Sequence, residues 1–421
     1  MQKKIKQLFF NITILLFTIC FLIMAAEVSL RIISKEPTEG KWVGAEKKYY
    51  EYDPLLGWRK IPNTNEIRAS IRGNNKVLYQ INSKGIRGPE YSYDKPRGEY
   101  RILILGDSFA EGYMIEFNNL FSEVLKNNLN NNAPKHKRYQ VINTGVSGWS
   151  TDQELLFFQN EGKKYNPDLV ILMFYENDIT YNNLPKDWGM YYKPLFKIKD
   201  RNLVLTNVPV PKPDTFVYHG HLEPEEKSVV KRLRRWLDTN SYLYKFIKER
   251  IENSYRLKNL ITRPRSKDNA EDGGNDSVME YRVWEKKYNN AVRASWEITE
   301  AMIKKLQKDA DTAGSKLLIF NVPFEGSIYQ EEWKKLKNKY GFSDKDWDVN
   351  TPGFVLCDIC KKNNIAFMNP TELLKDKAKE MDKDKKRLYD PLDHHWTVEG
   401  NKIVGDILAE FIGREYLGDN K

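Results

Sequence analysis

Short runs of branched apolar residues, separated by longer amphipathic stretches, recur along the chain from residue 101 onward. Strands that are apolar throughout are typical of a parallel sheet covered by helices on both faces. The predicted strands are Arg101–Leu105, Tyr139–Asn143, Asp168–Phe174, Lys316–Val322 and Ile365–Phe367. The predicted helices are Phe121–Leu129, Thr151–Tyr165, Tyr281–Ala313 and Val398–Ile412. The alternation therefore predicts an α/β fold with a parallel sheet.

The last of these helices has the clearest pattern. Its apolar residues fall on one face, and they are Ile403, Val404, Ile407, Leu408, Phe411 and Ile412. Thr397 is expected to cap its first turn, because a hydroxyl accepts an otherwise unpaired backbone N–H. Gly413 is expected to end it, because glycine adopts the left-handed conformation easily.

The amino terminus carries an uncharged segment, Leu8–Ala26, close to the ~20 residues that span a bilayer. A cleaved signal peptide is the alternative, with Met24–Ala26 as a cleavage site, but its apolar core is usually shorter, ~7–15 residues. An uncleaved signal-anchor is therefore favoured. Lys3, Lys4 and Lys6 precede the segment, so the positive-inside rule places everything after about residue 30 outside the cytoplasm.

These patterns divide the chain into four parts. They are a cytoplasmic tail at 1–7, a transmembrane anchor at 8–30, a strand and loop segment at 31–98 that packs on the main domain, and the main domain at 99–421. An insertion at 180–280 interrupts the main domain and is expected to form a lid over the carboxyl ends of the strands. Within it we expect a hairpin at Tyr191–Pro211, a basic amphipathic helix at Lys227–Arg256 and a disordered loop at Arg263–Ser277.

Charge narrows the choice of partners only slightly. The chain has 421 residues with 68 Lys and Arg against 58 Asp and Glu, a formal net charge of +10. The basic residues are spread along the chain and form no nucleic-acid-binding motif, which favours a solvated basic surface. A domain outside the cytoplasm also has no access to cytoplasmic nucleic acid, so no nucleic-acid partner is expected.

The three cysteines give little chemistry. Cys20 lies in the apolar segment, whereas Cys357 and Cys360 would share one face of a helix. Such a pair is either a local disulfide or redox pair, or two small apolar residues in a core. The second interpretation is favoured, because no thioredoxin-like Trp-Cys context is present.

Polar residues follow the strands where each one ends, which is where open α/β sheets place their sites. The first strand delivers Gly106-Asp107-Ser108, a position suited either to a nucleophile or to an ordinary helix cap. Gly148 follows the second strand and Asn177 the third, and both can offer a hydrogen-bond donor at the same edge. Near the carboxyl terminus, His395 has a nearby carboxylate that can orient it to take a proton from a serine hydroxyl.

This ordered set resembles the four sequence blocks of the SGNH (GDSL-type) hydrolases, in the form of the membrane-anchored members that bacteria use on cell-surface glycans. The blocks match at Gly106-Asp107-Ser108, at Gly148, at Asn177 and at His395 with Trp396-Thr397. The resemblance implies a three-layer α/β/α fold of SGNH or flavodoxin-like type. It also implies that Ser108 is the nucleophile and His395 the general base, with the amides of Ser108 and Gly148 and the Asn177 side chain forming the oxyanion hole.

The acid that orients the histidine departs from the common family pattern. The usual Asp lies three residues before the His, where this chain has Leu392. Asp393 is the natural substitute, and Asp390 is less suitable because Pro391 stiffens the turn between it and the histidine. His394 is a minor rival as the base.

Two other classes of enzyme fit less well. An α/β-hydrolase is disfavoured, because the chain has no Gly-x-Ser-x-Gly motif and its acid and histidine lie together. His219, His221 and Glu223 suggest metal ligands, but they lack the second pair that a dedicated site needs and are interpreted as a surface loop. No metal or other cofactor is expected.

The expected reaction is attack of Ser108 on an ester, followed by release of the acyl group. Release to water makes a serine esterase acting on acyl groups, O-acetyl groups above all, of an extracytoplasmic glycan or lipid-linked substrate. Release to a sugar hydroxyl makes an O-acyltransferase of cell-surface polysaccharide. A catalytically inactive glycan-binding subunit and a structural partner in polysaccharide export are the remaining alternatives. Four aromatic residues of the insertion are candidates for stacking on sugar rings or for packing it onto the domain, Trp188, Tyr191, Tyr192 and Trp236.

Overall fold

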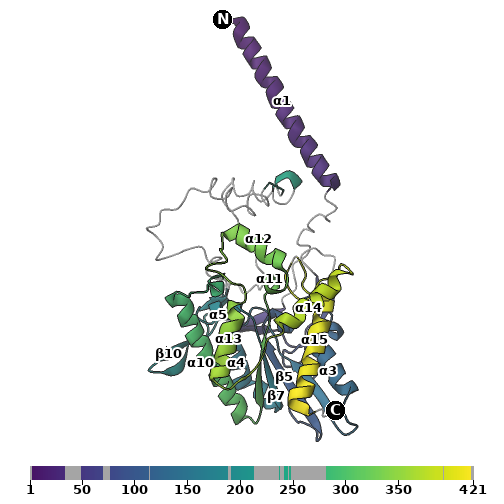
Figure 1. Cartoon of the computed structure of the whole chain (residues 1–421), viewed down its shortest axis with the longest axis vertical. Coiled ribbons are helices and arrows are strands. Elements are labelled where there is room, and N and C mark those ends of the chain that lie inside the picture. The colour runs from purple at the N-terminus through teal and green to yellow at the C-terminus, as the bar shows by residue number, and fades with distance from the viewer. Residues whose placement is uncertain are drawn as a thin grey trace.

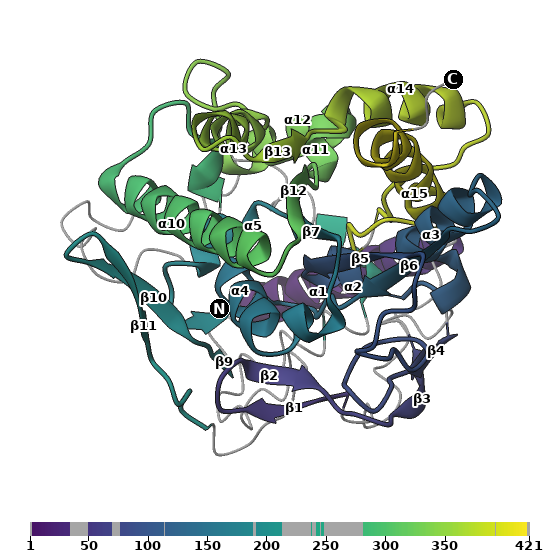
Figure 2. The same ribbon diagram turned by 90° about the horizontal axis from the view of Figure 1, so that it is seen from below.

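The computed structural model describes residues 2–33, 49–69, 76–112, 114–187, 191–212, 237, 241–244, 246–247, 281–391 and 393–418 (Figure 1). A long helix, α1 (Gln2–Ile33), projects away from the body of the structure and carries the amino terminus at its far end. The body is built around a sheet, which Figure 2 shows from below.

The central sheet has five strands in the order β13-β12-β7-β5-β6, and every neighbouring pair is parallel. Its strands are β5 (Glu99–Gly106), β6 (Arg138–Asn143), β7 (Leu169–Phe174), β12 (Lys316–Asn321) and β13 (Ala366–Met368). Each lies within two residues of a strand predicted from the sequence, so the predicted parallel sheet is confirmed. Because the strands are parallel, their carboxyl ends share one edge of the sheet.

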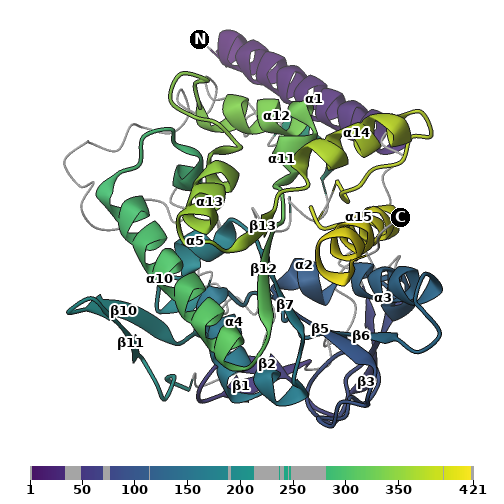
Figure 3. The same ribbon diagram turned by 60° about the horizontal axis from the view of Figure 1, so that its bottom comes forward.

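Alternate residues of each strand point to opposite faces, so the sheet separates two apolar cores. In β5, Leu103 and Leu105 belong to the first core, and Ile102 and Ile104 belong to the second. The first core is covered by α4 (Thr151–Asn160), α10 (Asn290–Thr312) and α13 (Thr351–Lys362). The second is covered by α3 (Phe121–Asn131), α14 (Thr371–Asp382) and α15 (Val398–Ile412). Helices α3 and α15 lie side by side in Figures 2 and 3, and the three-layer α/β/α fold is confirmed.

The remaining described elements are short. The strands are β1 (Tyr50–Asp53), β2 (Gly57–Lys60), β3 (Asn65–Ala69), β4 (Lys76–Gln80), β8 (Lys186–Asp187), β9 (Tyr191–Tyr192), β10 (Leu195–Lys199) and β11 (Asn202–Thr206). The α-helices are α2 (Ser108–Glu111), α5 (Asn177–Tyr181), α11 (Glu325–Ile328) and α12 (Gln330–Tyr340). Single turns of other helix types are η1 (Phe117–Asn119), η2 (Gly162–Tyr165), η4 (Arg282–Trp284) and η5 (Gly413–Leu417).

Both ends of α15 fall where the sequence pattern places them. Thr397 Oγ1 accepts the N–H of Gly400 at 3.0 Å, as predicted. The α-helix ends at Ile412 with Gly413 as its C-cap, as predicted, but Gly413 is right-handed rather than left-handed, and the chain continues into the π-helical turn η5. The left-handed glycine is Gly418, with φ of 65°.

Helix α10 begins later than predicted. The periodic pattern suggested a start at Tyr281, but the Asn289 side chain accepts the N–H of Val292 at 2.9 Å and fixes the start at Asn290. Arg282–Trp284, within the predicted range, form the turn η4 instead. A local side-chain cap therefore decided the boundary, whereas the apolar pattern alone did not.

The segment Phe9–Arg31 of α1 is long and apolar enough to cross a membrane, judged by length and composition. A membrane anchor and a signal sequence share these properties. The finding agrees with the predicted apolar span.

The β-hairpins after α1 pack against the loop that follows β6. Trp58 Nε1 donates to the carbonyl of Ser147 at 3.0 Å, and Trp149 Nε1 donates to the carbonyl of Trp58 at 3.0 Å. All three side chains are buried. The reciprocal bonds hold this loop in one position relative to the amino-terminal strands.

The described part of the insertion contains the predicted hairpin, in which β10 and β11 pair antiparallel. Its turn residues Asp200 and Arg201 both have positive φ, of 50° and 62°, as a two-residue hairpin turn requires. Tyr191 is buried, with its ring 6.2 Å from that of Trp58, so it packs the insertion onto the domain. Several earlier predictions lie outside the described residues, namely those for Trp188, His219, His221, Glu223, Trp236, the loop 263–277 and most of the helix 227–256.

Cys357 and Cys360 lie on α13, and both are free thiols. Cys360 is fully buried in the first core, and this burial raises the pKa of its thiol to about 12. A thiol in this environment stays protonated and behaves as a small apolar side chain.

Candidate active site

Ser108 stands directly beyond the carboxyl end of β5, as the first residue of α2. The turn into α2 needs a glycine, because a Cβ atom on Gly106 would lie 2.6 Å from the Cβ of Ala110 and 2.9 Å from that of Met173. Asp107 caps α2, and its Oδ1 accepts the N–H of Phe109 at 2.8 Å. The chain therefore turns sharply and presents the serine at the edge of the sheet.

His395 meets Ser108 across 287 residues of sequence: the distance from His395 Nε2 to Ser108 Oγ is 2.8 Å. The histidine sits in a turn held by backbone bonds, in which Asp390 N–H donates to the carbonyl of His395 at 2.8 Å and His394 N–H donates to that of Asp390 at 2.9 Å. The ring of Phe109 lies 5.0 Å from the imidazole of His395 and packs against it. The structure thus brings the predicted serine and histidine into hydrogen-bond distance.

Asp393 lies beside the imidazole of His395. Its Oδ1 accepts the backbone N–H of His395 at 2.9 Å and is 3.5 Å from Nδ1 of the ring. Burial raises the pKa of the Asp393 carboxyl, but the contacts with His395 lower it more, so the net shift is downward. Asp390 takes part in the turn through the backbone bonds above, and Leu392 lies outside the described residues.

His394 points to a different carboxylate. Its Nδ1 lies 2.6 Å from Oε2 of Glu325, which is buried at the start of α11. This contact raises the pKa of His394, whose side chain is 59% exposed. Arg387 also contacts Glu325, at 3.3 Å. His394 therefore belongs to a partly buried ion-pair network next to the site.

Gly148 and Asn177 both follow strands that flank β5. Gly148 has φ of 78°, a conformation that favours glycine, and it lies between two residues held by Trp58. Asn177 is the first residue of α5, and its Nδ2 donates to Asp107 Oδ2 at 3.2 Å. The Asp107 carboxylate thus links the asparagine to the turn that carries Ser108.

Beneath this turn lies a buried group of carboxyls that was not singled out from the sequence. Burial raises the pKa of Asp107 to about 6, although the Phe109 N–H, His395 and Asn177 lower it. Burial and the neighbouring carboxyls raise the pKa of Glu154 and Asp178 well above their usual range. Lys193 supplies a buried cation, with Nζ 2.7 Å from Asp152 Oδ2.

Glu111 is a second buried carboxylate that the sequence did not single out. Its Oε2 accepts the backbone N–H of Ser147 at 2.6 Å and the hydroxyl of Tyr50 at 2.8 Å, and its Oε1 lies 3.4 Å from Arg68 Nη1. Burial raises the pKa of Glu111, but Lys60, Arg68 and these hydrogen bonds lower it more, so the net shift is downward. A glutamate three residues after the serine was the available signal, but its partners are distant in sequence.

Residues 104–244 match the family model described as the GDSL-like Lipase/Acylhydrolase family. No curated protein matches the chain. The chain is similar to a solved catalytic mutant of Axe2, an acetylxylan esterase from Geobacillus stearothermophilus, with 11% identity, a TM-score of 0.38, and coverage of 75% of this chain and 94% of that chain. It is also similar to a lipase/acylhydrolase from Enterococcus faecalis, with 12% identity, a TM-score of 0.35, and coverage of 75% and 96%.

The family match includes Ser108, Gly148 and Asn177, three of the four blocks on which the sequence resemblance rested. His395 lies beyond the matched residues, and the fold returns it to Ser108. The match therefore places residues 104–244 with the GDSL-type hydrolases and supports serine hydrolase chemistry, of the esterase or acylhydrolase kind, for this chain.

Proposed function

We propose that this chain is a serine esterase that removes ester-linked acyl groups, O-acetyl groups above all, from an extracytoplasmic glycan or lipid-linked substrate. Ser108 is the nucleophile, His395 the general base, and Asp393 the acid that orients the base. The observation that carries the proposal is the distance of 2.8 Å between Ser108 Oγ and His395 Nε2. A neutral imidazole at this distance accepts the hydroxyl proton as the oxygen attacks the ester carbonyl.

The negative charge that develops on the carbonyl oxygen needs donors that are already in place. We assign this role to the N–H groups of Ser108 and Gly148 and to the Asn177 amide. Each donor of this kind contributes ~10²–10³-fold in rate, because it meets a charge that exists only in the transition state. Asp107 supports the assignment, since it fixes the Asn177 amide at 3.2 Å and caps the helix of Ser108.

Asp393 is favoured over Asp390 as the orienting acid. Its Oδ1 is 3.5 Å from His395 Nδ1, and the backbone bond from His395 N–H at 2.9 Å fixes the carboxylate on that side of the ring. A carboxylate there stabilises the imidazolium that forms when the serine loses its proton. The same proton is then returned to the leaving alcohol, and water releases the acyl group from Ser108.

The test uses the full-length protein in detergent with p-nitrophenyl acetate as the substrate. Wild type should release p-nitrophenol, and Ser108→Ala and His395→Ala should each lower kcat/KM by at least ~10³-fold. Absence of turnover in wild type would favour the inactive glycan-binding alternative. Adding an acceptor oligosaccharide and looking for its acylation by mass spectrometry separates the esterase from an O-acyltransferase.

We also propose that α1 is retained as an anchor and that the site lies outside the cytoplasm. The proposal rests on the apolar span Phe9–Arg31 and on the lysines that precede it. Protease added to intact spheroplasts should digest the body of the protein and leave a membrane-bound amino-terminal fragment. Protection of the whole chain would reverse the orientation, and a mature amino terminus near residue 27 would show cleavage.

A further inference from the structure

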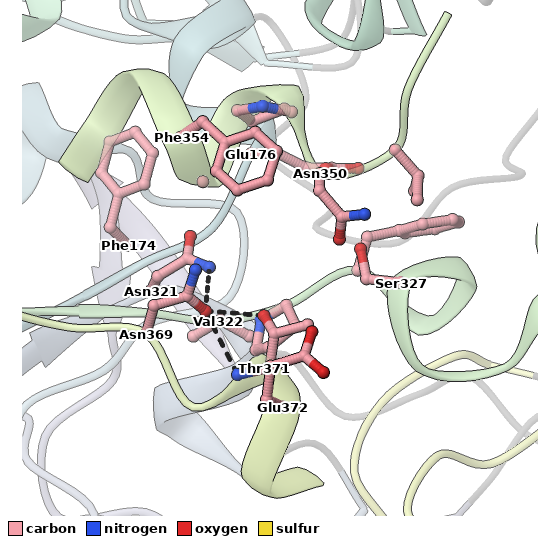
Figure 4. A pocket seen from close by; sticks show the side chains of 15 residues that line it. Phe174, Glu176, Asn321, Val322, Ser327, Asn350, Phe354, Asn369, Thr371 and Glu372 are labelled. Atoms are coloured by element: carbon pink, nitrogen blue, oxygen red, sulfur yellow. Dashed lines mark hydrogen bonds between the residues drawn. The ribbon is translucent and has the colours of Figure 1, made fainter. Parts of the chain in front are cut away.

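A cavity of about 190 Å³ opens at the carboxyl edge of the sheet (Figure 4). It is formed by the ends of β7, β12 and β13 and by the starts of α13 and α14. Pockets for drug-sized ligands measure ~300–1,000 Å³, so this cavity is suited to a unit about the size of one sugar ring.

The lining of the cavity and the proposed site share the segment that ends β7 and begins α5. Phe174 ends the strand and Glu176 lines the cavity. The next residue, Asn177, donates to Asp107 at 3.2 Å, and Asp107 adjoins Ser108. A ligand unit in the cavity is therefore next to the place where the proposed reaction would occur.

Amide and hydroxyl groups from different elements converge on one side of the cavity. Asn369 Oδ1 accepts Asn321 Nδ2 at 3.2 Å and Thr371 Oγ1 at 2.6 Å, which fixes the orientation of both amides. A Cβ atom on Gly353 would lie 3.3 Å from Nδ2 of Asn321 and also 3.3 Å from Nδ2 of Asn369. The glycine thus leaves open the space over two amide groups, which both donate and accept hydrogen bonds.

The opposite side of the cavity carries an exposed aromatic ring. Phe354, on the first turn of α13, is 59% exposed, and Figure 4 shows it with Asn350 across the opening from Asn321 and Asn369. An exposed phenylalanine facing oriented amides offers an apolar surface for the C–H face of a sugar and hydrogen bonds for its hydroxyls.

The charge of the lining favours a neutral ligand. Glu176 and Glu372 are acidic, and none of the described residues that line the cavity is basic. Lys375 pairs with Glu372 at 2.8 Å from outside the lining and offsets part of that charge. A phosphate or a uronate would meet the carboxylates of Glu176 and Glu372 and no basic residue in the lining, so these ligands are disfavoured.

We propose that this cavity is a subsite for a neutral sugar residue of the substrate, held between the Phe354 ring and the Asn321–Asn369 amides. The inference rests on the proposed function, because it places a glycan unit next to the ester that Ser108 attacks. It adds a substrate class, neutral hydroxyl-rich glycans, and residues that recognise it.

The test compares Phe354→Ala with Leu373→Ala, a matched control because Leu373 is a large apolar residue that is 53% exposed on neighbouring α14 and does not line the cavity. The substrates are p-nitrophenyl acetate and O-acetylated xylotetraose. Phe354→Ala should lower kcat/KM for the tetraose roughly tenfold and leave that for the small ester unchanged, whereas Leu373→Ala should change neither. Gly353→Ala, which adds a methyl group over the amides, should also lower only the tetraose activity.

Titration of the protein with unmodified xylotetraose, measured by calorimetry, tests the subsite proposal independently of the esterase proposal. Weaker binding to Phe354→Ala than to Leu373→Ala supports the subsite even if no variant shows esterase activity. Equal behaviour of the two variants in both assays, or no binding to wild type, overturns the subsite and leaves the esterase proposal standing. Absence of p-nitrophenyl acetate turnover by wild type overturns the esterase proposal alone.

Discussion

Glu111 joins the helix of Ser108 to the loop of Gly148, because its Oε2 accepts the backbone N–H of Ser147 at 2.6 Å. Glu111 lies one turn after Ser108, and Ser147 immediately precedes Gly148. Both side chains are buried. A carboxylate in this position fixes the distance between two elements that we assign to the same reaction.

We predict that Glu111→Gln destabilises the protein by about 3 kcal/mol, because it leaves Arg68 and Lys60 buried without a facing charge. It should also lower kcat on p-nitrophenyl acetate more than it changes KM, since a neutral amide accepts the Ser147 N–H in the loop of Gly148 more weakly than a carboxylate does. Urea unfolding and steady-state kinetics measure the two effects. Glu116→Gln, an exposed glutamate nearby, is the control and should change stability by less than about 0.5 kcal/mol.

The net lowering of the Glu111 pKa also predicts a dependence on pH. A carboxyl whose pKa is lower in the folded state contributes stability above its ordinary pKa of 4.5, and this contribution is lost as the pH falls through the folded value. The stability difference between wild type and Glu111→Gln should therefore shrink below about pH 4.5. A difference that stays constant from pH 7 to pH 3 would contradict the assignment.

His394 and His395 are predicted to behave differently although they are adjacent. His395→Gln removes the proposed base and should lower kcat/KM by ~10³-fold or more. His394→Gln should keep kcat/KM within about threefold, because His394 contacts Glu325 at 2.6 Å rather than Ser108. Equal losses in the two variants would mean that the turn, and not one imidazole, determines activity.

The pKa of His394 is raised by its hydrogen bond to Glu325, which sets the sign of its effect on stability. A histidine with a raised folded pKa stabilises the protein fully below its ordinary pKa of 6.5, and this stabilisation is lost as the pH rises through the folded value. Thermal unfolding should therefore show a larger destabilisation by His394→Gln at pH 5.5 than at pH 8.5.

Much of the sheet could be predicted from the sequence, because strands such as β7 are apolar at every position and are followed by polar residues. The helices α11 and α12 could not. In α12, Trp333, Leu336 and Tyr340 share one helix face, but only Trp333 is buried and most of the other residues are charged, so the apolar signal is weak. Its position depends on tertiary contacts, which a single sequence does not display.

The residues of the candidate site also differ in whether the sequence alone identified them. Ser108, Gly148 and Asn177 follow strand ends and were found locally, and their catalytic roles stay predictions. Lys193 and Glu325 gave no local signal, since their partners Asp152 and His394 lie 41 and 69 residues away in sequence. Charged residues of this kind become visible only when the fold buries them beside each other.

We predict that Lys193→Met destabilises the protein by roughly 3–5 kcal/mol, because it leaves the fully buried Asp152 without its partner. Lys193 Nζ also donates to the carbonyl of Tyr181 at 2.9 Å. The double variant Lys193→Met/Asp152→Asn should recover part of the loss, since neither charge is then buried. Urea unfolding measures both, with the exposed Lys197→Met as the neutral control. A double variant no more stable than the single one would contradict the pairing.

Asp107 should make the protein less stable as the pH rises. Burial raises its pKa to about 6, above the ordinary 3.8, so the folded state holds the proton more tightly than the unfolded state does. The contribution of Asp107 to the free energy of unfolding is therefore greatest below pH 3.8. It decreases by up to about 3 kcal/mol as the pH rises through 6. Asp107→Asn can still cap α2, but it cannot accept the hydrogen bond from the Asn177 amide. The stability lost with this hydrogen bond is the same at every pH. The free energy of unfolding of this variant relative to wild type should therefore rise between pH 4 and pH 8, and a flat difference across that range would show that Asp107 is not held in its protonated form.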